Sequence, residues 1–197
     1  IKDTFEDGSE RRENLLKMYH DLEDRMIMAP ASGKEEFHYC HVGGYVEHVL
    51  HVVDCAVQIK ELWVKNNATI NFTDEELIFA AMHHDLGKVG DLDNDYYIPN
   101  DSEWHRKNMG KEYKINPNNP FTLVNDLSVW LLQHYGIEVT WNEMLGIKLT
   151  DGLYDESNKP YYISRSADAK LKTNLGYVMH QADCMAARIE YERWNKN

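Results

Sequence analysis

The stretch Met82-His83-His84-Asp85-Leu86-Gly87-Lys88 decides how this chain of 197 residues is interpreted. The apolar residues before it, 77–81, recur at helical spacing, and Thr73 with Glu76 forms a capping box at the start of the same segment. We therefore expect a helix that ends at His84 and Asp85, where an imidazole and a carboxylate lie together. Both groups are ligands for divalent transition metals, but one helix cannot complete such a site.

Two other segments with a helical pattern supply further ligand candidates. Residues 42–66 carry apolar side chains at three- and four-residue intervals, and His48 shares the face that we expect to be buried. The last helical pattern, roughly 167–194, contains Asp183 on an apolar face, where a carboxylate is costly unless it is paired or binds a metal. The helical patterns therefore make His48 and Asp183 candidates for completing a metal site with His84 and Asp85.

This order of residues resembles the HD-domain metal-dependent phosphohydrolases, whose signature is a His, then a His-Asp pair, then a distant Asp, all on helices. The segment Phe37-His38-Tyr39-Cys40-His41-Val42-Gly43-Gly44-Tyr45-Val46-Glu47-His48-Val49-Leu50 also resembles the first motif of HD-family exoribonucleases, in which the final His is the ligand. The resemblance covers roughly residues 37–188. It implies an all-α fold, namely an HD-domain helical bundle. It also implies that Asp85 and Lys88 are catalytic residues, and a lysine at position 88 could hold a phosphate.

Two further histidines resemble the additional ligands of dinuclear HD proteins. His105 and His134 both lie between the His-Asp pair and Asp183, and His134 ends an apolar helical pattern. The resemblance implies one or two divalent ions per chain, from Mn, Fe, Co, Ni or Mg. His41 and His51 are candidates for supporting positions, and His180, one turn before Asp183, is the alternative distal ligand.

The helical patterns predict one HD domain over residues 1–197. A helix is expected at 9–28 within an N-terminal helical extension, 1–33, and helical character returns at 121–135 and 141–150. Residues 91–120 lack periodicity and form a long irregular insert, a length typical of functional loops. A second polar loop covers 155–166, and no strand-like alternation persists anywhere, so we expect an all-α fold.

The insert also supplies most of the candidate substrate-binding residues. Trp104 could stack on a nucleotide base, and basic side chains near it could contact phosphates. The basic candidates are Arg106, Lys107 and Lys111, with Arg165 in the second polar loop.

The composition limits the partners that we expect. There are 33 acidic residues against 21 Lys and Arg, a net charge of −12, which repels long nucleic acids and favours a small phosphorylated substrate, such as a nucleotide. Three cysteines without paired spacing favour reduced thiols and a cytoplasmic location. No apolar run is long enough to predict a membrane span. The oligomeric state is not predicted.

The resemblance implies a metal-dependent phosphohydrolase in which metal-activated water attacks a phosphoester of a nucleotide or a short oligonucleotide. Three alternatives stay open. A 3′-5′ exonuclease is favoured by the likeness at residues 37–50 and disfavoured by the acidic charge. A mixed-valent di-iron oxygenase of the HD type uses the same order of ligands, and a non-catalytic nucleotide-binding HD module would bind without turnover.

Overall fold

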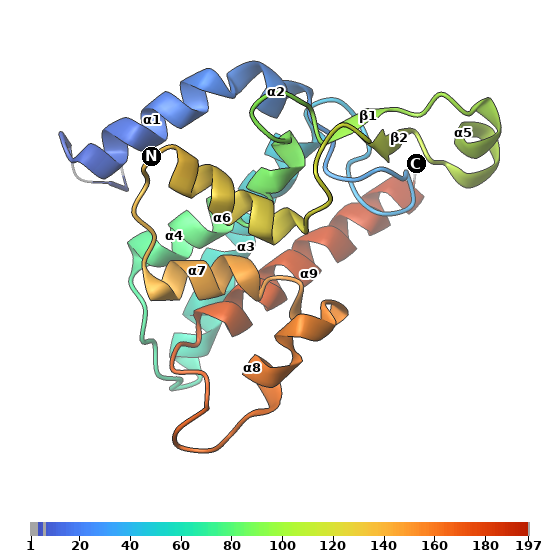
Figure 1. The fold of residues 1–197 in the computed structure, drawn as a ribbon. Coiled ribbons are helices and arrows are strands. Elements are labelled where there is room, and N and C mark those ends of the chain that lie inside the picture. Colours follow the sequence, from blue (N-terminus) through green and yellow to red (C-terminus); the bar gives the residue numbers. More distant parts are fainter. Residues whose placement is uncertain (1–3, 6, 197) are drawn as a thin grey trace.

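The fold is mostly helical (Figure 1), as a computed structural model of the chain shows for residues 4–5 and 7–196. The predicted range 1–197 therefore includes positions 1–3, 6 and 197, which lie outside the described residues. One antiparallel two-stranded sheet accompanies the helices in the described part of the chain. No helix in that part is both long enough and apolar enough to cross a membrane.

The N-terminal segment forms two helices, where the sequence predicted one. α1 (Glu10–Asp21) begins after the N-cap Ser9, and α2 (Glu23–Met28) follows Leu22, whose backbone leaves the helical conformation at ψ 4°. Leu15 and Met18 of α1 have no exposed surface and belong to the main hydrophobic core. The predicted N-terminal extension is therefore packed into that core.

Three helices form the centre of the molecule. α3 (Gly44–Lys65) packs against both α4 (Asp74–His83) and α9 (Leu175–Asn195). Small buried residues, such as Ala56 of α3 and Ala182 of α9, allow close approach of the helix backbones. The predicted capping box is present: Thr73 Oγ1 accepts a hydrogen bond from Glu76 N, and the Glu76 carboxylate accepts one from Thr73 N.

Two more helices fix the segment that contains the His-Asp pair. α7 (Trp141–Lys148) packs against α4 and α9, and α6 (Val124–His134) packs against the 3₁₀-helix Leu86–Val89 that directly follows Asp85. A Cβ on Gly87 would lie 2.3 Å from Val124 O, and Gly87 N donates to Ser128 Oγ at 2.8 Å. The glycine of the motif is thus required by the close packing of α6.

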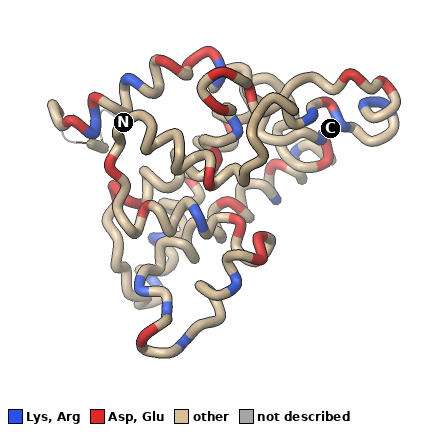
Figure 2. The backbone as a smooth tube through the Cα atoms, viewed as in Figure 1, with Lys and Arg blue, Asp and Glu red and all other residues tan. Residues whose placement is uncertain are grey.

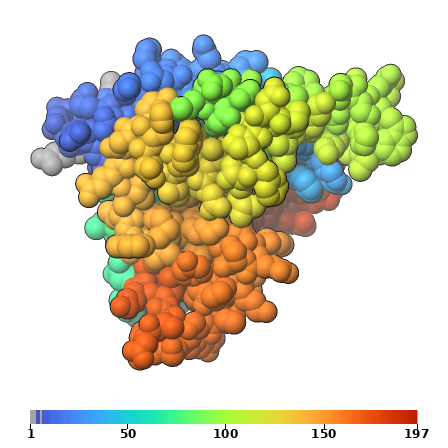
Figure 3. Space-filling model, in the orientation of Figure 1, coloured from blue at the N-terminus to red at the C-terminus, as the bar shows by residue number. Residues whose placement is uncertain are grey.

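The predicted insert at 91–120 is not irregular throughout. β1 (Tyr97–Pro99) pairs with β2 (Tyr113–Ile115), with Tyr97 opposite Ile115, and α5 (Glu103–Met109) connects the two strands. Each strand has only three residues, which is too short for alternation to be detected in the sequence. We call residues 97–115 the arm. Figures 1 and 3 show that its α5 end projects from the helical body.

The C-terminal part also differs from the predicted boundaries. The second polar loop contains α8 (Lys159–Ile163), preceded by the 3₁₀-helices Gly152–Tyr154 and Glu156–Asn158. The last helix begins at Leu175 and not near residue 167, because Ala167–Lys170 form turns and bends.

Candidate metal centre

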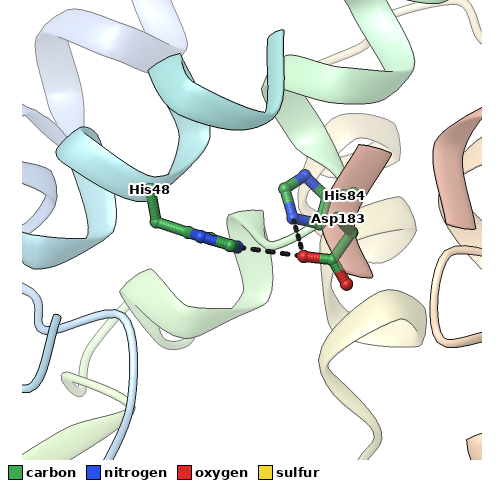
Figure 4. Close-up of side chains that lie close together, drawn as sticks. All are labelled: His48, His84 and Asp183. Carbon is green, nitrogen blue, oxygen red and sulfur yellow. Dashed lines mark ion pairs between the residues drawn. The ribbon is translucent and has the colours of Figure 1, made fainter. Parts of the chain in front are cut away.

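The three central helices bring His48, His84 and Asp183 together, as the sequence predicted (Figure 4). One ligand atom from each residue lies within 4.8 Å of the others. Asp183 Oδ1 is 3.2 Å from His48 Nε2 and 3.8 Å from His84 Nε2. We call these three residues the metal-ligand group. They could hold a metal ion. His48 comes from α3, His84 from the end of α4 and Asp183 from α9, so the fold brings three distant segments together.

The two imidazoles are oriented as metal ligands require. His48 Nδ1–H donates to the Glu190 carboxylate at 3.0 Å, and His84 Nδ1–H donates to Ala81 O at 2.8 Å. In each neutral ring the lone pair is then on Nε2. Both Nε2 atoms are buried and make no well-directed hydrogen bond with the protein. Since a buried nitrogen without a partner is costly, the donor set fits a divalent transition metal.

Glu190 supports this site and was not predicted. Its side chain is fully buried, one carboxylate oxygen accepts from His51 Nδ1–H at 2.7 Å, and the carboxylate also holds His48. Glu190 follows Asp183 by seven residues, so both project from the same face of α9. That spacing was the available signal, because an acidic residue on an otherwise apolar helix face needs a partner. His51 thereby takes the supporting position proposed for it.

Asp85 and Lys88 lie directly beside the metal-ligand group. Asp85 Oδ2 is 3.5 Å from both His48 Nε2 and His84 Nε2, and 2.5 Å from Lys88 Nζ. The side chains of Asp85 and Lys88 are mostly buried. Asp85 is therefore placed to complete the donor set, and Lys88 adds a positive charge at its edge.

The charged groups in this cluster shift one another's pKa values. Burial alone lowers the pKa of His48, but the carboxylates of Asp183 and Glu190 outweigh it and raise the pKa to about 9. Burial opposes the shift of Asp85 as well, yet Lys88 and His84 hold the pKa of that carboxyl well below its usual range. Without a metal, protons on the imidazoles therefore balance the carboxylates, and a bound cation would replace those protons.

The two histidines proposed for a second metal lie elsewhere. His105 is exposed on α5, with Nδ1 2.6 Å from Ser102 Oγ, and His134 is exposed at the end of α6, stacked on Trp130. Neither belongs to the metal-ligand group. The apolar pattern before His134 correctly marked a helix, but the buried face of α6 carries Leu127 and Leu131 instead.

His180 does not take the place of Asp183. Its Nδ1–H donates to Thr150 O at 2.8 Å, and its ring fills the space beside Gly152. His41 is exposed and lies outside the metal-ligand group.

The predicted substrate-binding residues also lie outside the metal-ligand group. Trp104 is 62% exposed on α5, Lys107 pairs with Glu103, and an Arg106 guanidinium N–H donates to Asn100 O. Lys111 follows α5 in the arm, and Arg165 is exposed after α8. None of these five residues lines the cavity beside Asp183, whose walls include His38, Asp151, His180 and Arg188. Their role in binding stays a prediction.

Comparison with known proteins finds no matching family model, no similar curated protein and no similar solved structure.

Proposed function

We propose that this chain is a metal-dependent phosphohydrolase of the HD type, acting on a phosphoester of nucleotide size. The observation that carries the proposal is the pair of buried Nε2 atoms of His48 and His84, which face the Asp183 carboxylate and make no hydrogen bond with the protein. The order of these residues is that of the HD signature, and Asp85 lies beside them.

The residues have separate tasks in this reaction. His48, His84, Asp85 and Asp183 would hold a divalent metal, which when bound lowers the pKa of water and offsets negative charge on a phosphoryl oxygen. Glu190 fixes the ring of His48 through Nδ1, and Ala81 O does the same for His84. Lys88 Nζ is held at 2.5 Å by Asp85, where its charge can stabilise an anionic phosphoryl group.

The positions of two histidines and the net charge favour hydrolysis of a small ester over the oxygenase and exonuclease alternatives. The oxygenase reading needs a second iron, and the histidines proposed for it, His105 and His134, lie outside the metal-ligand group. The exonuclease reading needs a surface that attracts a nucleic-acid chain, and the net charge is −12.

The test is hydrolysis of p-nitrophenyl phosphate and bis-p-nitrophenyl phosphate by protein loaded separately with Mn, Co, Ni, Fe or Mg. We expect turnover with at least one ion, and a loss of about a hundredfold or more in the His84→Ala variant because a ligand is removed. His20→Ala is the matched control, since His20 is exposed on α1. Oxygen consumption without release of p-nitrophenol from either ester would contradict the proposal.

A further inference from the structure

We propose that the substrate lies in the cavity along α9 that includes Asp183, that His38 Nε2–H donates to the substrate's phosphate, and that the substrate carries a single phosphate group. This inference rests on the proposed phosphohydrolase function and adds where the substrate binds and which class it belongs to. Substrate recognition would then lie outside the arm, where the sequence analysis placed most of the candidates, and away from Arg165 in the second polar loop.

His38 is the third imidazole at the site with a buried nitrogen that has no partner. Its Nε2 makes no hydrogen bond, and its ring centroid lies 4.5 Å from that of His48. His38 is nevertheless not part of the metal-ligand group, whose ligand atoms lie within 4.8 Å of one another. The His38 ring therefore lies beside one ligand of that group, and it lines the same cavity as Asp183, so its Nε2 is available to a molecule bound there.

The loop that carries His38 is held in one conformation. Ser32, which is 4% exposed, donates from Oγ to His38 O at 2.7 Å, and Ala31 N donates to Tyr39 O at 3.1 Å. Tyr39 has a φ of +36°, a left-handed conformation that is strained for a bulky residue. Such strain persists only where surrounding contacts impose it, so His38 is positioned by the fold.

The cavity beside His38 has the size of a small-molecule site. It measures about 550 Å³, within the range of roughly 300–1,000 Å³ that is usual for such sites. Asp183 belongs both to this cavity and to the metal-ligand group. The walls also include the aromatic rings of Phe37, Tyr154 and Tyr191, which come from three different segments. A phosphate at Asp183 would thus place its organic moiety among aromatic side chains, which can pack against a planar ring.

The charges that line the cavity limit the substrate to one phosphate. Its walls carry three carboxylates, on Glu36, Asp151 and Asp183, against one cationic side chain, Arg188. Burial raises the pKa of Asp151, and repulsion by the Asp85 and Asp183 carboxylates raises it further.

The balance of charges at the site favours a substrate with one phosphate over a triphosphate. A dication, Lys88 and Arg188 together bring four positive charges, and the four carboxylates of Asp85 and the cavity walls already balance them. Glu190 beside His48 and Glu192 beside Arg188 add two further negative charges. A triphosphate would add several uncompensated negative charges, whereas a phosphomonoester or phosphodiester adds only about one or two.

Arg188 is placed for the outer end of such a substrate. Its guanidinium lies over the Tyr191 ring at 5.0 Å and pairs with Glu192 at 3.3 Å, and its side chain is 68% exposed. An exposed surface pair of this kind costs little to break. Arg188 can therefore turn to a polar group on the organic moiety.

The first experiment is calorimetric binding of phenylphosphonate, a non-hydrolysable analogue with one phosphonate and one ring, to metal-loaded protein. We expect His38→Ala to weaken binding about tenfold with unchanged metal content, and His38→Gln, which retains a donor, to weaken it less. His41→Ala is the matched control, because His41 is exposed in the same loop. Metal loss in His38→Ala, or an unchanged Kd, would overturn the proposal.

The second experiment compares kcat/KM for a nucleoside monophosphate, its diester and its triphosphate in the wild-type chain. We expect at least about a tenfold preference for the substrates with one phosphate, and a rise in KM with little change in kcat for Arg188→Ala. A preference for the triphosphate would overturn the inference while leaving the phosphohydrolase standing. Absence of hydrolysis of every ester would instead refute the proposed function, and phenylphosphonate binding would still show whether His38 contacts the ligand.

Discussion

At the scale of single residues, a second layer of contacts prepares the metal-ligand group. Glu190 is buried against both His48 and His51, and His48 in turn contacts Asp85 and Asp183. Because such partners fix the tautomer and raise the basicity of a ligating imidazole, they contribute to metal affinity without touching the metal.

Replacing Glu190 with Gln should therefore weaken metal binding. We expect a loss of about 10- to 100-fold in affinity, because the amide cannot supply the negative charge that polarises the Nδ1–H of His48. Competition with a fluorescent chelator measures the affinity, and Glu61→Gln, on the exposed face of α3, is the matched control. Equal affinity in both variants would show that Glu190 has no such role.

A second residue-scale prediction concerns acid stability. His83 is fully buried, with Nδ1–H donating to Phe79 O and Nε2 accepting from the Tyr19 hydroxyl, and burial lowers the pKa of His83 to about 3 from its usual value of 6.5. Below that usual value the unfolded chain binds a proton that the folded chain does not. The stability contribution is therefore complete above about pH 6.5 and is lost as the pH falls toward about 3.

Between pH 6.5 and 5 His83 should lower the free energy of unfolding by about 1.5 kcal/mol. Urea unfolding of the metal-free protein at several pH values measures this. The His83→Gln variant should show a shallower dependence, although His38, whose pKa burial also lowers to about 3, acts in the same direction. An identical pH dependence in both proteins would contradict the assignment.

The sequence predicted the ligands of the site better than their supports. His48, His84 and Asp183 each lay on an apolar helical face, and the resemblance to the HD pattern singled them out among the other histidines. The spacing within α9 places Glu190 on the same face as Asp183, but it does not reveal that the partners of Glu190 come from α3, so Glu190 was missed. His105 and His134 matched the order of the HD pattern, but order along the chain does not tell which face of a helix a residue occupies.

At the scale of elements, long segments were predictable and short ones were not. α3 and α4 begin and end within a few residues of their predicted limits, because periodicity extends over several turns and a capping box marks the start of α4. The strands of the arm and α8 have three and five residues, which is less than periodicity can detect. The division between α1 and α2 also left no trace in the apolar pattern.

The packing of α6 on the His-Asp segment gives an element-scale prediction. A Gly87→Ala substitution would bring Cβ to 2.3 Å from Val124 O and 3.1 Å from Leu127 Cβ, so α6 must move away. We expect a loss of about 2 kcal/mol in unfolding free energy, with weaker metal binding because Asp85 and Lys88 move with the segment. An unchanged midpoint in urea unfolding would show that the contact can relax without cost.

Substitutions in the arm, in contrast to Gly87→Ala, should have little effect. Trp104 and Lys107 project from α5, outside the cavity at Asp183, so Trp104→Ala and Lys107→Ala should leave kcat/KM within about twofold. Steady-state kinetics with the best ester found for the wild type provide the measurement. A loss of tenfold or more in either variant would return substrate recognition to the arm.

At the scale of the whole molecule, net charge distinguishes the two hydrolytic hypotheses, a phosphohydrolase of small esters and a 3′-5′ exonuclease. Figure 2 shows Asp and Glu spread along most elements, with Lys and Arg scattered singly or in short groups over the described residues. With a net charge of −12, the molecule lacks the long-range attraction that brings nucleic-acid chains to their enzymes.

We therefore expect no binding of a single-stranded oligonucleotide of about 30 nucleotides at physiological salt. Fluorescence anisotropy measures it, with metal-loaded wild-type protein and the His84→Ala variant to suppress cleavage. Binding at micromolar concentration or tighter would favour the exonuclease.

We expect His48, His84 and Asp183, with Asp85 beside them, to hold one divalent metal. Anomalous diffraction at the metal absorption edge, from crystals grown with manganese, cobalt, nickel or iron, would locate that ion. We expect one strong peak at about 2.0–2.2 Å from Nε2 of both histidines and from an Asp183 oxygen. No peak there with any of these ions, in crystals whose fold is the one described, would contradict it.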